Sequence, residues 1–178
     1  MIAIVIGGAR SGKSRFAENF FADANSVCYI ATAEIIDEEM RARVQKHIDA
    51  RPSSWRTCEN PTNPYLCIDQ EENYILDDIT NLISNIMFNL SGESSELDES
   101  LEYEIEKEVI RQLDYLLDAV NYKDKNIIMV SNEVGMSIVP MNRLSRVFRD
   151  IQGRVNQYLA QRAESVYFIF AGIEVKVK

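Results

Sequence analysis

The chain has 178 residues, of which 46% are hydrophobic and 26% are charged, and its formal net charge is −9. This length and composition predict a single folded domain, residues 1–178, with a sizeable core. The acidic balance argues against a nucleic-acid partner, which usually requires a basic surface. No apolar run approaches the roughly 20 residues of a membrane-spanning helix, so no membrane span is expected.

Apolar runs alternate with amphipathic patterns from the N-terminus onward. The runs are rich in β-branched and aromatic residues and do not alternate with polar residues, which is typical of strands buried on both faces. Five such strands are predicted: Ile2–Ile6, Val27–Ala31, Tyr74–Asp77, Asn126–Ser131 and Val166–Ala171. Helical patterns lie between them: Lys13–Ala24, Asp37–Ala50, Asp78–Leu90, Leu101–Val120 and Asn142–Ala163. This order predicts an α/β fold with a mostly parallel sheet flanked by helices on both sides.

Two segments depart from the alternation. The stretch from 91 to 108 is strongly acidic, and its first half is poor in core residues until Leu101. It is interpreted as an acidic insertion, an exposed loop before a long helix, with a partner-binding element as the alternative. The last residues, Ile173–Lys178, alternate apolar and charged side chains and predict a short edge strand.

The cysteines are Cys28, Cys58 and Cys67, an odd number without a CxxC pair. They predict no disulfide framework and fit a reducing cytoplasm. The apolar run Ile2–Ile6 is not preceded by the basic head of a signal peptide, so we expect a cytoplasmic protein.

A phosphate-binding motif follows the first predicted strand. Residues 7–14, "GGARSGKS", match G-x-x-x-x-G-K-[ST] and lead directly into a helical pattern. Glycines allow backbone N–H groups to surround phosphates, Lys13 places a positive charge there, and the Ser14 hydroxyl can bind Mg²⁺. The alternative is a glycine-rich turn that only connects a strand to a helix. The predicted nucleotide-binding residues of the motif are Gly7, Gly8, Ala9, Arg10, Ser11, Gly12, Lys13 and Ser14.

Phosphate loops of this kind usually work with an acidic residue at the end of a neighbouring strand. Asp77 ends the apolar run "YILD" and is therefore the predicted metal ligand, together with Ser14. Asp78 is the competitor, although an Asp at this place is also typical of a helix N-terminus.

Further polar residues follow the strand that ends near Ser131. Ser131, Asn132 and Glu133 would face the ligand crevice at the carboxyl end of a parallel strand and contact substrate or a metal-bound water, or they could form a capping turn. Arg143, Arg146 and Arg149 follow with a spacing of three residues. They could neutralise phosphates, but a solvent-exposed helix face explains them as well.

His47 is the only histidine of the chain. It lies near the end of a predicted helix, because Pro52 prevents the helix from continuing. A single histidine at such a place is typical of packing or capping. If the crevice also holds a nucleotide, imidazole is a competent nucleophile at phosphorus, because with an ordinary pKa of about 6.5 it is largely neutral at pH 7.

Four sequence blocks point to a known family. They are "GGARSGKS" (7–14), "YIATAEIIDEEMRARVQKHIDARPSSWRTCE" (29–59), "LDDITNLISN" (76–85) and "VSNEVGMSIVPMNRLSRVFRDIQGRVNQYLA" (130–160). With these blocks the chain resembles the bifunctional adenosylcobinamide kinase/adenosylcobinamide-phosphate guanylyltransferase family of cobalamin biosynthesis. The resemblance covers nearly the whole chain. It implies a recombinase-like P-loop fold, often assembled as a homotrimer.

The resemblance also implies an activity. Members of the family phosphorylate adenosylcobinamide with GTP or ATP and then transfer GMP from GTP to the product through a guanylyl-histidine. The family's histidine falls on His47, with Lys13 as the other expected catalytic residue. Its nucleotide-binding positions fall on the phosphate loop and on Ala31, Thr32, Ala33, Ile48, Asp49, Ala50, Arg51, Glu59 and Asp77.

Some positions depart from the family pattern. Asp77 stands where some members carry Glu, and Asp78 and Asn81 stand where apolar or small residues are common. Two other functions stay open at this point: a simple P-loop kinase for another small alcohol, with a structural His47, or a nucleotide-gated binding module.

Overall fold

The sheet determines where the site lies. The computed structural model describes residues 1–34, 38, 45, 51–92 and 97–178. In the described part, seven strands form one sheet in the order β3-β2-β4-β5-β1-β6-β7, and only β7 is antiparallel to its neighbour. The strands are β1 (Ile2–Gly7), β2 (Val27–Ala31), β3 (Arg56–Glu59), β4 (Asn73–Asp77), β5 (Asn126–Asn132), β6 (Ser165–Phe170) and β7 (Ile173–Lys176).

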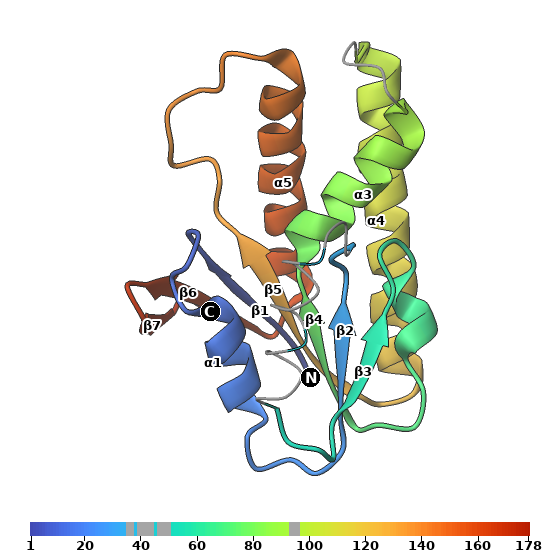
Figure 1. The fold of residues 1–178 in the computed structure, drawn as a ribbon, viewed down its shortest axis with the longest axis vertical. Helices are drawn as coiled ribbons and strands as arrows, with labels where there is room; N and C mark the ends of the chain where they lie inside the picture. The colour runs from blue at the N-terminus through green and yellow to red at the C-terminus, as the bar shows by residue number, and fades with distance from the viewer. Residues whose placement is uncertain (35–37, 39–44, 46–50, 93–96) are drawn as a thin grey trace.

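Helices cover the two faces of the sheet unequally (Figure 1). The described helices are α1 (Lys13–Phe20), α3 (Ile79–Ser91), α4 (Glu99–Tyr122), α5 (Arg143–Arg162) and a 3₁₀ turn, η1 (Pro64–Cys67). Alternate residues of β1 show the division. Ile4 packs in the large core with α3, α4 and α5, whereas Ala3 and Val5 pack in the smaller core with α1. Because successive strand residues face opposite sides, strands covered on both faces must be apolar throughout.

Local sequence signals fix where three helices begin. Asp78, Asp98 and Asn142 are the N-cap residues of α3, α4 and α5, and each side chain accepts a hydrogen bond from a backbone N–H three residues later. These bonds satisfy N–H groups that have no partner within the helix. The cap of α3 confirms the helix N-terminal interpretation of Asp78.

The predicted α/β fold with a mostly parallel sheet is confirmed. All five predicted strands and the edge strand at the C-terminus are present. The strand β3 was not predicted, because "RTCE" is short and polar. The predicted helix Asp37–Ala50 lies almost wholly outside the described residues. The acidic stretch was expected to contribute no core residue before Leu101. Leu97 already belongs to the core, because it is only 2% exposed.

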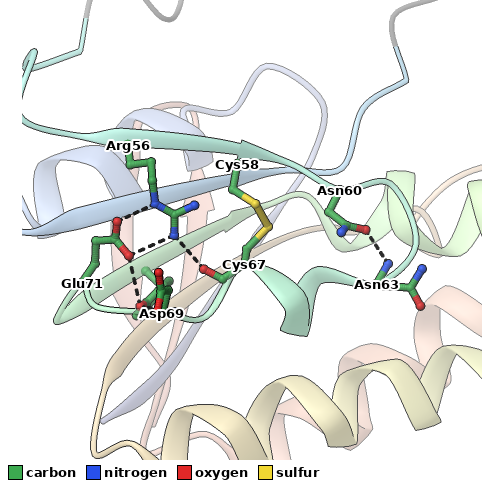
Figure 2. The surroundings of a disulfide bond; sticks show 8 residues. Arg56, Cys58, Asn60, Asn63, Cys67, Asp69 and Glu71 are labelled. Carbon is green, nitrogen blue, oxygen red and sulfur yellow. Dashed lines mark hydrogen bonds and ion pairs between the residues drawn. A yellow bond between two sulfur atoms is a disulfide. The ribbon is translucent and has the colours of Figure 1, made fainter.

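The prediction of no disulfide was wrong. Cys58 on β3 and Cys67 on η1 form a disulfide, with their Cα atoms 6.0 Å apart (Figure 2). An odd cysteine count does not exclude one pair, and the unpredicted strand β3 is what brings the two together. Cys28 is the remaining cysteine and is buried in β2. Burial raises the pKa of its thiol to about 12.

Candidate active site

The phosphate loop (residues 7–14) joins the end of β1 to the start of α1. Gly12 has φ 105°, a left-handed conformation that favours glycine. A Cβ on Gly7 would lie 2.7 Å from the carbonyl oxygen of Ile169 on β6, so no larger residue fits there. The Ser11 N–H donates to the carbonyl oxygen of Gly8 (3.3 Å), which closes the turn. Glycine is thus required both for the turn and for the close approach of β6.

Lys13 is the charged group of the loop. Its side chain is 6% exposed, and its ammonium donates a hydrogen bond to the carbonyl oxygen of Gly8 (2.7 Å). Burial lowers the pKa of Lys13, while the negative charges of Asp78 and Asp77 act in the opposite direction. A cation held against a backbone turn is suited to bind phosphate oxygens, and the two acids help keep this ammonium charged.

Asp77 is the last residue of β4. It lies at the carboxyl ends of the parallel strands, where the phosphate loop also follows β1. The hydroxyl of Tyr29 on β2 donates a hydrogen bond to Oδ2 of Asp77. The guanidinium of Arg51 lies over the Tyr29 ring, 3.2 Å from its centre, and its Nε donates to Oε1 of Glu18 on α1 (3.1 Å). Burial, together with the charge of Asp77, raises the pKa of Tyr29 well above its ordinary value, so the phenol stays a donor. The Asp77 carboxylate is therefore held in place from β2.

Asp78 lies beside Asp77 in a polar network. Its Oδ1 caps α3, and its Oδ2 accepts a hydrogen bond from Nδ2 of Asn132 at the end of β5 (2.9 Å). Thr32 is fully buried; its hydroxyl donates to the carbonyl oxygen of Asp78 (2.7 Å) and accepts from its N–H (2.8 Å). Burial, followed by the charge of Asp77, raises the pKa of Asp78 to about 6. The strand ends of β2, β4 and β5 are thus tied together around the two acids.

Comparison with known proteins decides the family. A family model described as cobinamide kinase / cobinamide phosphate guanyltransferase matches residues 3–177. The chain belongs to this family.

Curated relatives of the CobU family match over full length. The bifunctional adenosylcobalamin biosynthesis protein CobU of Salmonella typhimurium is 44% identical over 183 residues, which cover 100% of both chains. CobU of Escherichia coli is 41% identical, also over 100% of both chains. The bifunctional protein CobP of Pseudomonas aeruginosa is 35% identical over 98% of this chain and 96% of its own. The predicted resemblance is confirmed.

The structure brings together part of the predicted site of this CobU-family chain. The phosphate loop and Asp77 lie at one edge of the sheet, and Ala31, Thr32 and Ala33 follow at the end of β2. Glu59 at the end of β3 pairs with Ala31 in the ladder, and its side chain is exposed. Four predicted residues lie outside the described part of the chain: His47, Ile48, Asp49 and Ala50.

Other predicted residues have local tasks. Glu133 accepts hydrogen bonds from the N–H groups of Gly135 and Met136, so it forms the capping turn that was the alternative interpretation. Arg146 donates to the carbonyl oxygen of Pro140 (3.0 Å), and Arg149 pairs with Asp150. The interpretation of these arginines as a solvent-facing helix surface therefore agrees with their contacts.

Sequence reasoning missed Tyr29 as part of the site. Its place in a buried strand gave no sign that its hydroxyl reaches a carboxylate 48 positions away. The single signal was a tyrosine among aliphatic residues in "VCYIA", since a buried phenol needs a hydrogen-bond partner.

Proposed function

We propose that this chain phosphorylates adenosylcobinamide with GTP or ATP and then transfers GMP from GTP to adenosylcobinamide phosphate, which gives adenosylcobinamide-GDP. The observation that carries the proposal is the phosphate loop with its buried Lys13, close to two acids, in a chain that matches the bifunctional family over its full length. Full-length relatives at 35–44% identity carry names that describe both a bifunctional protein and adenosylcobalamin biosynthesis.

In the kinase half, the hydroxyl oxygen of adenosylcobinamide attacks the γ-phosphorus of the nucleotide. The bond from γ-phosphorus to the bridging oxygen breaks, the nucleoside diphosphate leaves, and the hydroxyl proton passes to solvent. Lys13 and the N–H groups of the phosphate loop stabilise the charge that develops on the bridging and γ-oxygens. Because these groups are fixed before the reaction, they need little reorganisation in the transition state.

The residues around the phosphate loop and Asp77 suit a magnesium ion that is bound mainly by the phosphates of the nucleotide. Within the described residues, no group of three or more His, Cys, Asp or Glu side chains could hold a metal ion by itself. Mg²⁺ usually takes one or two protein oxygens and completes its shell with phosphate oxygens and water. Ser14 in the first turn of α1 and Asp77 would supply those oxygens, and the ion would neutralise charge on the phosphates. Oδ2 of Asp77 already accepts from Tyr29, which leaves Oδ1 for this task.

In the transferase half, His47 is the proposed nucleophile. Its imidazole nitrogen attacks the α-phosphorus of GTP, the bond to the β-phosphate oxygen breaks, and pyrophosphate leaves. A phosphate oxygen of adenosylcobinamide phosphate then attacks the guanylyl group, and the bond to His47 breaks. Lys13 stabilises the departing pyrophosphate. Glu59 would bind the guanine or ribose, and Ala31, Ala33 and 48–51 would line the same side. Thr32 is fully buried and would instead hold the backbone of Asp78.

We also propose a homotrimer in the cytoplasm. The Cys58–Cys67 disulfide does not support this location, because disulfides are rare in reducing compartments. The loop between β5 and α5 supports an assembly, because Met136, Ile138, Val139 and Met141 are all exposed, Ile138 to 93%. Exposed apolar groups that follow one another in the chain are typical of an interface. None of the helices in the described part of the chain has the length and apolarity needed to cross a membrane.

The assembly can be tested by sedimentation. Ile138→Asp should yield monomers, because the charge would be buried in the interface. Tyr122→Asp, at a side chain that is 91% exposed on α4, is the matched control and should leave the mass unchanged. A wild-type chain that sediments as a monomer at all concentrations would refute the trimer.

The proposed function is tested by assaying the half-reactions separately. Purified protein, Mg²⁺ and γ-labelled GTP should transfer label to adenosylcobinamide. Protein, Mg²⁺ and α-labelled GTP should transfer label to adenosylcobinamide phosphate. Kinase activity without guanylyl transfer would favour a simple P-loop kinase with a structural His47. Nucleotide binding without either turnover would favour a binding module.

A further inference from the structure

A pocket lies beside the phosphate loop, on the side away from Asp77. Its volume is about 470 Å³. One wall is the loop itself, at Arg10, Ser11 and Gly12, and another is α1, at Phe16 and Asn19. The remaining wall comes from the turn between β6 and β7. Because the pocket shares the loop with the phosphate site, a nucleotide whose phosphates lie in the loop can extend its nucleoside into it.

The wall from β6 and β7 is fixed to the phosphate loop. The N–H of Gly172 donates a hydrogen bond to the carbonyl oxygen of Ser11 (2.8 Å). A Cβ on Gly12 would lie 3.6 Å from the Cα of Gly172, so the two backbones are in close contact. The pocket is therefore held in shape by backbone contacts.

The lining carries groups of the kinds that can bind a purine. Phe16 offers an aromatic surface held by Tyr167, with ring centres 4.9 Å apart. Arg10 and Arg15 are exposed cations that can stack on a base or approach phosphates. Glu174 pairs with Ile169 across the β6–β7 ladder, and Ile169 packs in the core on the α1 side. Residues opposite each other in a ladder point to the same face, so the Glu174 carboxylate is directed toward the pocket.

We propose that this pocket binds the purine base of the nucleotide that donates its γ-phosphoryl group in the kinase half, with guanine favoured through Glu174. A carboxylate only accepts hydrogen bonds, and guanine offers N–H donors side by side on its Watson–Crick edge. Adenine has an acceptor at the corresponding ring nitrogen and gains less from Glu174. The inference rests on the proposed function, since it names the base subsite of the same phosphate loop.

The position of Glu59 indicates a second direction for the nucleoside. Glu59 ends β3 and the pocket adjoins β6, and these two strands are separated by five strand spacings in the sheet. At about 4.8 Å per spacing this is roughly 24 Å, which is more than one nucleoside spans. The kinase nucleotide would thus extend toward β6, and the GTP that guanylylates His47 would extend toward β3. One phosphate loop could then present γ-phosphorus in one half-reaction and α-phosphorus in the other.

The test compares Glu174→Gln with the wild-type chain. The KM for GTP in the kinase half should rise about tenfold, and the KM for ATP should change less than twofold. Covalent labelling by α-labelled GTP should stay within twofold of wild type. Asp23→Asn, an exposed carboxylate just beyond α1 and outside the pocket, is the matched control and should change none of these values.

Two results would overturn the inference. An unchanged KM for GTP in Glu174→Gln would exclude the pocket as the base subsite. If Glu174→Gln lost kinase activity and covalent labelling equally, the nucleoside could not extend toward β6 in one half-reaction and toward β3 in the other. If the proposed function itself is wrong, the result is different: the wild-type chain would bind GTP in calorimetry but would convert neither adenosylcobinamide nor its phosphate. In that case a tenfold loss of GTP affinity in Glu174→Gln would still support the pocket, and unchanged affinity would refute it.

Discussion

The two sides of the phosphate loop are built differently. On the β6–β7 side, backbone groups hold the structure: β1 and β6 pair in parallel, and Gly172 bonds to Ser11. On the other side, β3 is an edge strand of four residues that pairs with β2 through the backbone and is further fastened by side chains. The disulfide joins β3 to η1, and Arg56 pairs with Glu71 and donates to the carbonyl oxygen of Cys67 (2.8 Å), as Figure 2 shows.

The β6–β7 side is thus held mainly by backbone contacts, whereas the position of β3 also depends on the disulfide and on the Arg56–Glu71 pair. Backbone contacts persist through most substitutions, whereas the disulfide or the Arg56–Glu71 pair is lost with a single change. Changes on the β3 side should therefore affect the position of Glu59 and the transferase half more than the kinase half. Four substitutions, in order of decreasing effect, probe the shared loop and the β3 side.

Lys13→Ala removes the charge that both sides share. Both half-reactions should fall by about 10²–10³-fold, the usual loss when one preorganised electrostatic contact to a transition state is removed. Steady-state rates of the two assays measure the effect, and circular dichroism checks that the chain is folded. A variant that retains one activity at the wild-type rate would contradict a common phosphate site.

Cys58→Ser removes the disulfide between β3 and η1. For a closed loop of about ten residues, the free energy of unfolding should fall by about 2–3 kcal/mol. Urea denaturation measures the change, and a reducing agent should lower the stability of the wild-type chain but not that of the variant. Equal stability of wild type and variant without reductant would show that the bond contributes nothing.

Tyr29→Phe removes the hydroxyl that holds Asp77 and keeps the ring under Arg51. Since Asp77 is the proposed magnesium ligand, the Mg²⁺ concentration at half-maximal rate should rise about tenfold, equivalent to about 1.4 kcal/mol. Thermal stability should change little. Tyr167→Phe, at the ring that contacts Phe16, is the matched control. An unchanged Mg²⁺ dependence would remove Tyr29 from the site.

Glu71→Gln removes the ion pair between Glu71 and Arg56 on β3, and its effect on stability should depend on pH. Hydrogen bonds from Arg56 lower the pKa of Glu71 below its ordinary value. The charged form thus stabilises the fold above the unfolded-state pKa of about 4.3, and this contribution is lost as the pH falls through the lower folded-state pKa. Wild type should exceed the variant by about 1 kcal/mol at pH 7 and match it near pH 2, as urea denaturation would measure. A difference that is constant with pH would contradict this cause.

The same contrast explains what could be predicted from sequence. The strand before the phosphate loop and the strand that ends at Asp77 depend on local patterns, and the bounds of each were predicted to within a residue or two. Tyr29 with Asp77, and Cys58 with Cys67, depend on which strands become neighbours. β3 is too short and polar to be recognised, so neither its pairing with β2 nor the disulfide could be predicted. The role of His47 came from the family resemblance alone and stays a prediction.

The proposed transferase reaction depends on a covalent guanylyl-histidine at His47. The chain is incubated with Mg²⁺ and α-labelled GTP, denatured, and examined for label that is acid-labile and base-stable, as expected for a phosphorus–nitrogen bond. We predict one guanylyl group, mapped by mass spectrometry to the peptide with His47, and no label in His47→Asn, which should keep its kinase activity. Label that persists in His47→Asn, or a wild-type chain that transfers GMP without ever carrying it, would contradict the account.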